Sequence, residues 1–344
     1  MKQLILPRSV RAFTADHAAD PSQMQGLTLD AATIDSAGAF LMGELERFDQ
    51  RLYEPLVQFT WSRDIDIRSD VTLADEVSSF ARINYGANPG TSSGSKKSFI
   101  STVADALPTV SVDLQKQFMP LTPWGMSLQW SVFELAASQK VGRPIDLQKA
   151  NAMNLKWNMD LDEQTYIGDT QLGVSGLFNN PNVSTSNAPN GAASSPLWAN
   201  KTPTEILADV NAVLNAAWAA SGYKYVPTEI RLPPANFSYI NAQLISTAGS
   251  RSILNYLAEN SLSNAQNGVP LRILPVKWLT GAGASGTNRM VAYTKREDLV
   301  RLPVVPLQRT MLQVKGIFQT TDYYGKLGAV EFPYTETIAY MDGI

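Results

Sequence analysis

The stretch that decides the fold runs from Pro144 to Asn180 and reads PIDLQKANAMNLKWNMDLDEQTYIGDTQLGVSGLFNN. Apolar residues recur in it at helical spacing, with Leu147, Ala150, Trp157 and Leu161 on one face and Ala152, Leu155, Met159 and Tyr166 on an adjoining face. Together these faces form a broad apolar surface. We therefore expect a long helix that is buried on more than one side.

Both ends of this helix can be predicted. Pro144 comes two residues after Gly142 and suits the first helical position, where its missing N–H costs nothing. Gly168 is a natural stop, because glycine readily adopts the left-handed conformation that ends a helix. About 25 residues at roughly 1.5 Å each give a rod of nearly 40 Å. A rod of this length needs other elements to pack against.

The chain before this helix is typical of extended structure. Residues 59–67 alternate and indicate a half-buried strand, with Asp64 and Asp66 on its solvent side. Strand-like residues 77–85 and 99–112 flank a tip of small and polar residues, Gly86 to Ser98. The residues alone favour an ordinary mobile surface hairpin. Still earlier, residues 1–38 show no sustained period and indicate an arm, and residues 40–56 are a candidate amphipathic helix.

The chain after the long helix indicates a mixed α/β region. Thr202-Pro203-Thr204-Glu205 forms a capping box, so a helix should begin there and run to about Ser221. We then expect a strand at 229–232, helices near 235–244 and 252–260, and a strand at 271–279. Residues from about 311 to the end are rich in strand formers and should return to the long helix.

This order of parts resembles the major capsid proteins of tailed bacteriophages, which have the Hong Kong 97 (HK97) fold. The motifs that carry the resemblance are the long helix ending in Tyr166-Ile167-Gly168-Asp169 and the Gly-Leu-Phe-Asn turn after it. The order of elements covers most of the chain, and the motif match is concentrated between Phe133 and Asn180. In that family the long helix is called the spine.

The resemblance implies an α+β, HK97-like capsid fold with four parts. These are an N-terminal arm and first helix (1–60), an extended β-hairpin loop (61–118), a peripheral domain (119–175 and 310–344) with the spine helix at about 144–168, and an axial α/β domain (176–309). In such subunits the extended loop lies across a neighbour.

The resemblance also implies a structural function. Copies of the chain would assemble into hexamers and pentamers of an icosahedral shell that encloses double-stranded DNA without sequence-specific binding. Further partners would be portal, scaffold and decoration proteins. The protein would be part of the virion, assembled in the host cytoplasm. A second interpretation with the same fold is an encapsulin-like nanocompartment shell. An interpretation from another class is a carboxylate-based hydrolase.

Composition agrees with a structural protein that has no catalytic, cofactor or metal site. The 344 residues are 17% charged with a formal net charge of -3, too neutral for charge alone to drive DNA binding. There is no cysteine, and His17 in the arm is the one histidine, which argues against zinc sites and serine–histidine triads. The sequence predicts no signal peptide and no membrane helix.

Three motifs that suggest an enzyme have simpler explanations. The segment from Gly281 to Gly286 matches the dinucleotide fingerprint, but a strand pattern follows where a helix is required, so we interpret it as a hairpin loop. The segment from Gly90 to Ser98 lacks the spacing of a phosphate-binding loop. The carboxylate pairs Asp160 with Glu163 and Asp64 with Asp66 have the residue types that glycosidases use, but Asp64 and Asp66 are more simply explained as the solvent side of an alternating strand.

Overall fold

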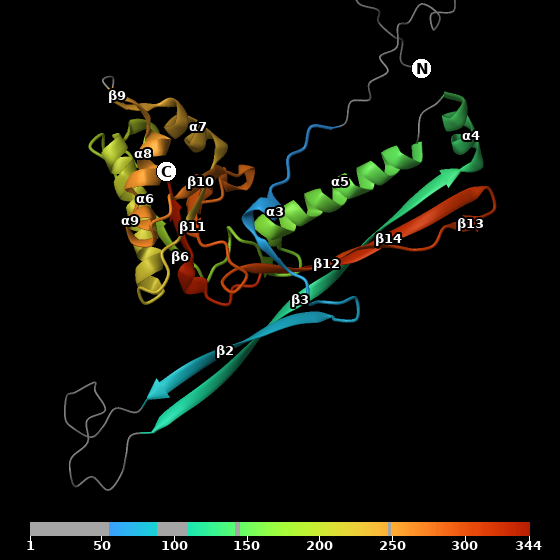
Figure 1. Cartoon of the computed structure of the whole chain (residues 1–344), viewed down its shortest axis with the longest axis horizontal. Coiled ribbons are helices and arrows are strands. Elements are labelled where there is room, and N and C mark those ends of the chain that lie inside the picture. The colour runs from blue at the N-terminus through green and yellow to red at the C-terminus, as the bar shows by residue number, and fades with distance from the viewer. Residues whose placement is uncertain (1–54, 88–108, 142–144, 247–248) are drawn as a thin grey trace, which may run out of the picture. The chain divides into compact units, whose positions relative to one another are not determined.

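The structure is a computed structural model that describes residues 55–87, 109–141, 145–246 and 249–344. The predicted arm, almost all of the predicted helix at 40–56 and most of the predicted hairpin tip lie outside the described residues. By its contacts the chain divides into two compact units, Met1–Val57 and Gln58–Ile344. The description below concerns the second unit (Figure 1).

The first sheet is built around one very long strand. Its six strands have the order β1-β12-β14-β3-β2, with β13 also paired to β14. Their bounds are β1 Asp66–Arg68, β2 Val77–Ala87, β3 Val110–Ser131, β12 Arg301–Arg309, β13 Gln313–Lys315 and β14 Phe318–Gly328. Residues 110–120 of β3 pair with β2, and residues 121–131 pair with β14, both antiparallel. The first half of β3 is therefore one arm of a two-stranded hairpin, and the second half belongs to the wider sheet.

The second sheet is mixed and has five strands in the order β10-β7-β11-β15-β6. Their bounds are β6 Ser184–Asn187, β7 Glu229–Leu232, β10 Arg272–Pro275, β11 Arg289–Tyr293 and β15 Ala339–Asp342. β7 runs parallel to β10, β15 runs parallel to β6, and the remaining neighbours are antiparallel. Two short pairs complete the strands: β4 Gly168–Asp169 with β5 Val174–Ser175, and β8 Leu244–Ser246 with β9 Gly249–Ser252.

Some helices pack against the first sheet and others against the second. Their bounds are α3 Trp61–Asp64, α4 Val132–Val141, α5 Ile145–Tyr166, α6 Pro203–Ala220, α7 Pro234–Ala242, α8 Ile253–Asn260 and α9 Leu262–Asn267. The predicted capping box of α6 is confirmed, with Thr202 and Glu205 each accepting from the other's backbone N–H. The predicted strand at 229–232 and the two helices after it are also confirmed. No helix among the described residues is long and apolar enough to cross a membrane.

The core has two large clusters, one on each face of the second sheet. Strand β11 shows the division, because Met290 and Ala292 pack with α6 and α8 while Val291 and Tyr293 pack with the end of α5. Successive strand residues point to opposite faces, so a strand covered on both sides is buried at every position. The second sheet therefore lies between a helical layer and the C-terminal half of α5.

The predicted long helix is confirmed as α5, but its predicted burial on more than one side holds only at its C-terminal end, where Leu161, Asp162 and Tyr166 are all buried. Met153, Trp157 and Leu161 are buried on one face. Leu147 and Met159, which the pattern placed in the apolar surface, are exposed. Before Leu161, the buried residues of α5 lie on one side only, so Leu147 and Met159 have no cover within the described part of the subunit.

The predicted strand at 59–67 is wrong in its first half. Residues 61–64 form the short helix α3, and only β1, which begins at Asp66, is extended. Asp64 is completely buried and not on the solvent side. Its neighbours explain the error, because Asp64 contacts Arg231 and Tyr166, which are distant in sequence, as well as the adjacent Arg63.

Strand pairing corrects two further expectations. The last strand, β15, does not return to α5 with the rest of the C-terminal segment: it lies inside the second sheet, between β11 and β6. The glycine segment from Gly281 to Gly286 is not a hairpin loop, because β7 lies between β10 and β11. The prediction that a strand follows this segment is confirmed by β11. The predicted strand at 271–279 is limited to β10, with a 3-10 turn after it.

Candidate assembly surfaces

The hairpin of β2 and β3 has one apolar face and one polar face. Residues directly opposite in an antiparallel pair share a face, and the register pairs Ile83 with Leu114 and Tyr85 with Val112. The apolar hairpin face consists of Val77, Ile83, Tyr85, Val110, Val112, Leu114 and Phe118. The other face carries Arg82, Asn84, Ser111, Asp113, Gln115 and Gln117. The alternation is regular in the outer half of the hairpin. Nearer the base, Ser79 and Lys116 lie on the apolar face and Phe80 lies on the other.

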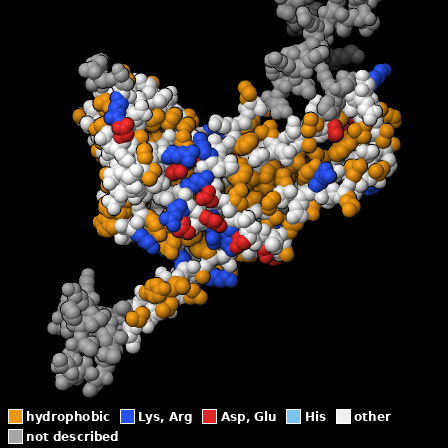
Figure 2. Space-filling view, in the orientation of Figure 1, with side chains coloured by type: hydrophobic (Ala, Val, Ile, Leu, Met, Phe, Trp, Pro, Cys, Tyr) orange, Lys and Arg blue, Asp and Glu red, His pale blue; other side chains and the backbone are white. Residues whose placement is uncertain are grey.

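No core lies against the apolar hairpin face in the described subunit. Leu114 is 66% exposed and Phe118 is 64% exposed. Hydrophobic side chains continue along the hairpin in the space-filling view (Figure 2). A contiguous apolar surface rimmed by polar residues marks an interaction site in a soluble protein. This face is therefore suited to contact another protein surface.

A second group of exposed apolar residues lies at the opposite end of β3. Val132 and Phe133 begin α4, and Ile317 and Phe318 lie at the start of β14 beside them. The backbone N–H of Val132 donates to the carbonyl of Ile317, which holds the two segments together. All four side chains are at least 41% exposed. The first sheet thus has exposed apolar side chains at both ends of its longest strand.

The base of the hairpin is fixed by charges. Ser78 of β2 donates to the buried carboxylate of Glu331, which also pairs with Arg68 and Arg301. Further along β2, Arg82 lies 2.8 Å from Glu336, a residue that follows the first sheet in the chain. These contacts hold the hairpin to the body at its base and leave its outer half free of them.

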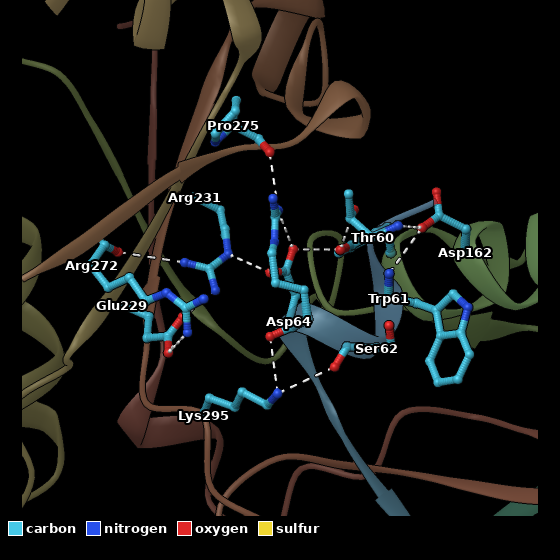
Figure 3. Close-up of polar contacts among 12 residues, drawn as sticks. Thr60, Trp61, Ser62, Asp64, Asp162, Glu229, Arg231, Arg272, Pro275 and Lys295 are labelled. Atoms are coloured by element: carbon cyan, nitrogen blue, oxygen red, sulfur yellow. Dashed lines mark hydrogen bonds and ion pairs between the residues drawn. The ribbon is translucent and has the colours of Figure 1, made fainter. Parts of the chain in front are cut away.

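A buried polar joint lies where the second sheet meets α5 (Figure 3). Its centre is the short helix α3. The backbone N–H groups of Thr60 and Trp61 donate to Asp162 Oδ1 of α5, at 2.6 and 3.1 Å. At the other end of α3, Tyr293 OH of β11 donates to the carbonyl of Asp64 at 2.8 Å. We call α3 and these contacts the interior joint.

Asp64 is the most heavily bonded residue of the interior joint. Arg63 donates to both of its oxygens, at 2.7 and 2.9 Å, and Tyr166 OH of α5 donates to Oδ2. Arg231 Nε of β7 lies 3.0 Å from Oδ1, an ion-pair distance, although its N–H is not aligned for a hydrogen bond. Arg231 also pairs with Glu229 and lies over the ring of Tyr293.

The joint keeps its groups in defined protonation states. Burial disfavours the charged form of Asp64, but the hydrogen bond from Arg63 and the charge of Arg231 outweigh it and lower the pKa of the carboxyl. Burial is the main reason that the pKa values of the Tyr166 and Tyr293 hydroxyls are raised. Both tyrosines therefore stay protonated and act as donors to Asp64, a permanent anion at neutral pH.

The candidate catalytic carboxylates have structural contacts. Asp160 accepts from Trp124 Nε1 at 2.8 Å and pairs with Lys156, while Glu163 is exposed beside it. Asp64 is buried in the joint, and Asp66 lies 3.4 Å from Lys295. Within the described residues, no group of three histidine, aspartate or glutamate side chains is placed to hold a metal ion. The glycine segment contains a single 3-10 turn and no α-helix follows it, so the anion-binding geometry of the fingerprint is not formed there.

Sequence reasoning missed the interior joint. A signal was present in β7, where Glu229 and Arg231 alternate with Ile230 and Leu232 in a strand that is buried at every position. Such alternation suggests a strand with one face in water. The fold instead places the charged face against α3, where Asp64 pairs with Arg231.

A subunit with exposed apolar faces is typical of a protein that functions in contact with other protein surfaces. Comparison with known proteins identifies the family. The chain belongs to the major capsid protein family, because the family model of that description matches residues 96–344, well over half of the chain. Among curated proteins, no sequence matches this chain.

Solved capsid structures share the fold. The capsid of Myoviridae phage XM1 superposes with a TM-score of 0.72 at 15% identity, over 88% of this chain and 98% of that one. The capsid of a native GTA particle gives 0.56 at 12% identity, over 91% and 99%. The structure from Gordonia phage Cozz gives 0.54 at 10% identity, over 92% and 96%. The predicted resemblance to phage capsid proteins of the HK97-like fold is confirmed, and the family is structural and not enzymatic.

Proposed function

We propose that the chain is the major capsid subunit of a tailed bacteriophage, and that its copies form hexamers and pentamers of an icosahedral shell around double-stranded DNA. Membership of the major capsid protein family supports a shell-forming function. The single observation in the subunit that carries the proposal is the apolar hairpin face, which has a regular pattern and no cover among the described residues. A neighbouring copy supplies the cover.

The contact is heterologous, since the apolar hairpin face of one copy meets a different surface of the next. Heterologous contacts close into a ring when the rotation from one subunit to the next is a whole fraction of a full turn. Hexamers and pentamers are rings of this kind. Each contact is modest in area. The shell is stable because every subunit makes the contact twice, once with its hairpin and once with its body, and the lattice repeats it.

We propose a revised division of the chain for this function. The extended-loop part comprises β2 and the first half of β3, and the peripheral part comprises α4, α5 and the rest of the first sheet, including β12. The axial part comprises the second sheet with its helices and takes in β15. Compared with the sequence-based division, β1 and β12 move to the peripheral part and β15 moves to the axial part.

Other partners follow from the same function. A phage shell of this kind needs a portal for DNA entry and, in many systems, scaffold or decoration proteins, and we propose assembly in the host cytoplasm before incorporation into the virion. The DNA is enclosed and is not recognised by sequence. The formal net charge of -3 supports this part of the proposal, because a chain without excess positive charge has little overall electrostatic attraction to the phosphate backbone.

The test is a charge placed on one face of the hairpin and then on the other. Leu114→Asp puts a carboxylate into the apolar hairpin face, and Gln117→Asp puts the same group on the exposed polar face three residues away. The full-length chain is expressed with its scaffold protein where one is needed. Electron microscopy and light scattering then measure the fraction of protein in shells.

We expect Leu114→Asp to abolish shells, because a carboxylate buried in an apolar contact without a partner is strongly unfavourable. We expect Gln117→Asp to assemble like the wild type. Normal shells from Leu114→Asp would contradict the role of this face. A wild-type chain that stays a monomer under every assembly condition would contradict the capsid function itself.

A further inference from the structure

The interior joint connects two parts of the subunit through one short helix. The first N–H groups of α3 are bonded to α5 through Asp162, which also accepts from Trp278 Nε1 at 2.7 Å. Its last carbonyls are bonded to the second sheet, because Lys295 Nζ donates to the carbonyl of Arg63 at 3.0 Å and Tyr293 OH donates to that of Asp64. α3 thus uses the bonding groups that a helix leaves free at its ends to link α5 to the second sheet.

Two opposite charges lie at the centre of this link. The side chains of Asp64 on α3 and Arg231 on β7 are both 0% exposed. Asp64 is also bonded to Tyr166 at the end of α5, so one carboxylate connects β7, α3 and α5. The fixed directions of the guanidinium and phenol groups define where α5 can lie relative to β7.

A contribution to folding stability does not by itself explain the buried Asp64–Arg231 pair. Removing two charges from water is costly, and a buried ion pair is often no more stabilising than apolar side chains of the same volume. The best-attested role of such pairs is to select one arrangement among several that apolar packing would tolerate. The contacts between α5 and the second sheet are otherwise largely apolar, with Trp157, Leu161 and Tyr293 in one cluster. Apolar contacts of this kind are non-directional.

We propose that Asp64 and Arg231 are positioning residues for assembly: they fix the orientation of α5 relative to the second sheet, and this orientation sets the curvature of the shell. The first half of the proposal concerns the isolated subunit. The second half rests on the proposed function, because curvature has meaning only in a shell. In a repeated lattice, a small change of angle within each subunit adds up over many copies.

The chain contains a matched control. Asp209 of α6 is also buried, accepts from Trp198 Nε1 at 3.0 Å and pairs with Lys201 at 2.5 Å. These partners are within about a dozen residues of it in sequence and belong to the same helical layer of the second sheet. Asp64 and Asp209 are therefore alike in residue type, in burial and in having a cationic partner, but Asp64 links α5 to the second sheet and Asp209 does not.

The orientation can be measured directly, because the chain has no cysteine. Asn154→Cys on α5 and Asn215→Cys on α6 are exposed sites for two spin labels. Electron–electron double resonance gives the distance distribution between them in the full-length chain, with labelled subunits diluted in unlabelled ones. The measurement is made on the wild-type background, on Asp64→Asn and on Asp209→Asn. Asp64→Asn with Arg231→Met is the fourth background, which removes both charges and leaves neither of the two unpaired.

We expect a narrow distribution in the wild type and in Asp209→Asn, and a distribution roughly twofold broader, or shifted, in both Asp64 backgrounds. If Asp64→Asn alone does not fold, the distance distribution of the double variant tests the positioning role. A distribution as narrow as the wild type in the Asp64 backgrounds, or equal broadening in Asp209→Asn, would overturn the positioning role.

Shell diameter tests the second half. Cryo-electron microscopy of shells from the same four backgrounds should show a single diameter for the wild type and Asp209→Asn, and mixed diameters or open sheets for the Asp64 backgrounds. Broadened label distances with unchanged shells would overturn the link to curvature only. Absence of any wild-type shell would count against the proposed function and leave the label distances as the test of the joint.

Discussion

The hairpin and the C-terminal half of α5 use similar residues for opposite purposes. Both carry apolar side chains at the regular spacing of their element: Ile83 and Leu114 across the hairpin, Trp157 and Leu161 along the helix. The helix buries its pair in the core, and the hairpin leaves its pair exposed. Regular apolar spacing therefore shows that a face will be covered, and it does not show whether the cover comes from the same chain.

The geometry of each region explains the difference. α5 lies where the two sheets meet, so its apolar side is covered by both. Among the described residues, the hairpin beyond its base has two strands and no layer on either face. An isolated two-stranded ribbon is marginally stable in water, so its outer half depends on contacts from elsewhere. The free energy of folding should therefore come from α5 and the sheets, and the free energy of assembly should come largely from the hairpin.

The largest effect should follow from Trp157→Ala. The indole is 8% exposed and makes an edge-to-face contact with Trp124, with ring centroids 4.9 Å apart. Removing it leaves a cavity where α5 meets the first sheet, and we expect a loss of about 3–5 kcal/mol of unfolding free energy. Urea unfolding followed by circular dichroism measures it. The Leu114→Asp background, which we expect not to assemble, confines the measurement to the subunit. A loss of unfolding free energy below about 1 kcal/mol would show that the packing of α5 contributes little to the stability of the core.

The next effect should follow from Gly168→Ala at the end of α5. Gly168 has a φ of 74°, and an added Cβ would lie 2.3 Å from the carbonyl oxygen of Val174. Left-handed strain and the clash together should cost about 2–4 kcal/mol. Gly173 is the matched control, since its φ is 66° but nothing lies within 4 Å of an added Cβ.

Gly173→Ala should therefore cost only about 1 kcal/mol, from backbone strain alone. Thermal unfolding of both variants, in the same background as above, gives the comparison. Equal losses in the two variants would mean that the turn after α5 relaxes freely, and that the end of the helix is less rigid than the core it joins.

The sequence predicted individual helices and strands better than the contacts that each of them makes in the fold. Local signals were enough for α5, with its glycine stop, and for the capping box of α6. They failed where distant contacts decide, as in residues 61–64, which form a helix because Asp162 and Tyr293 bond its two ends. The position of β15 was also beyond local signals, because pairing with β11 and β6 depends on partners far along the chain.

The candidate site was predictable in outline. Strand pattern and family resemblance together indicated an extended hairpin that contacts a neighbour. The pattern did not show which face is apolar and uncovered, because that depends on the register of Ile83 opposite Leu114. The interior joint was not predictable, since nothing near Arg231 in sequence indicates that Asp64 will be its partner.

A smaller effect concerns pH and the joint. The pKa of Asp64 is lower in the folded subunit than in the unfolded chain, so the unfolded chain binds the proton more readily. The contribution of this group is complete above the unfolded value of about 4, and it is lost as the pH falls through the folded value. Unfolding free energy measured from pH 7 to pH 3 should fall more steeply at its acid end in the wild type than in Asp64→Asn. Parallel curves would show that the joint does not hold Asp64 as an anion.

The smallest effect on stability should come from substitutions in the hairpin. This prediction tests most directly whether the hairpin contributes to assembly and α5 to folding. Leu114→Ser and Phe118→Ser remove apolar side chains that are already in water, so each should change the unfolding free energy of the subunit by less than about 0.5 kcal/mol. The same variants should raise the protein concentration needed for shell formation, because in the shell those side chains lose their contact with water. Denaturant unfolding of unassembled subunits and light scattering of the assembly reaction, on the same samples, measure both quantities. A subunit destabilised as much as by Trp157→Ala would place the hairpin in the folding core, and unchanged assembly would mean that its apolar face meets no neighbour.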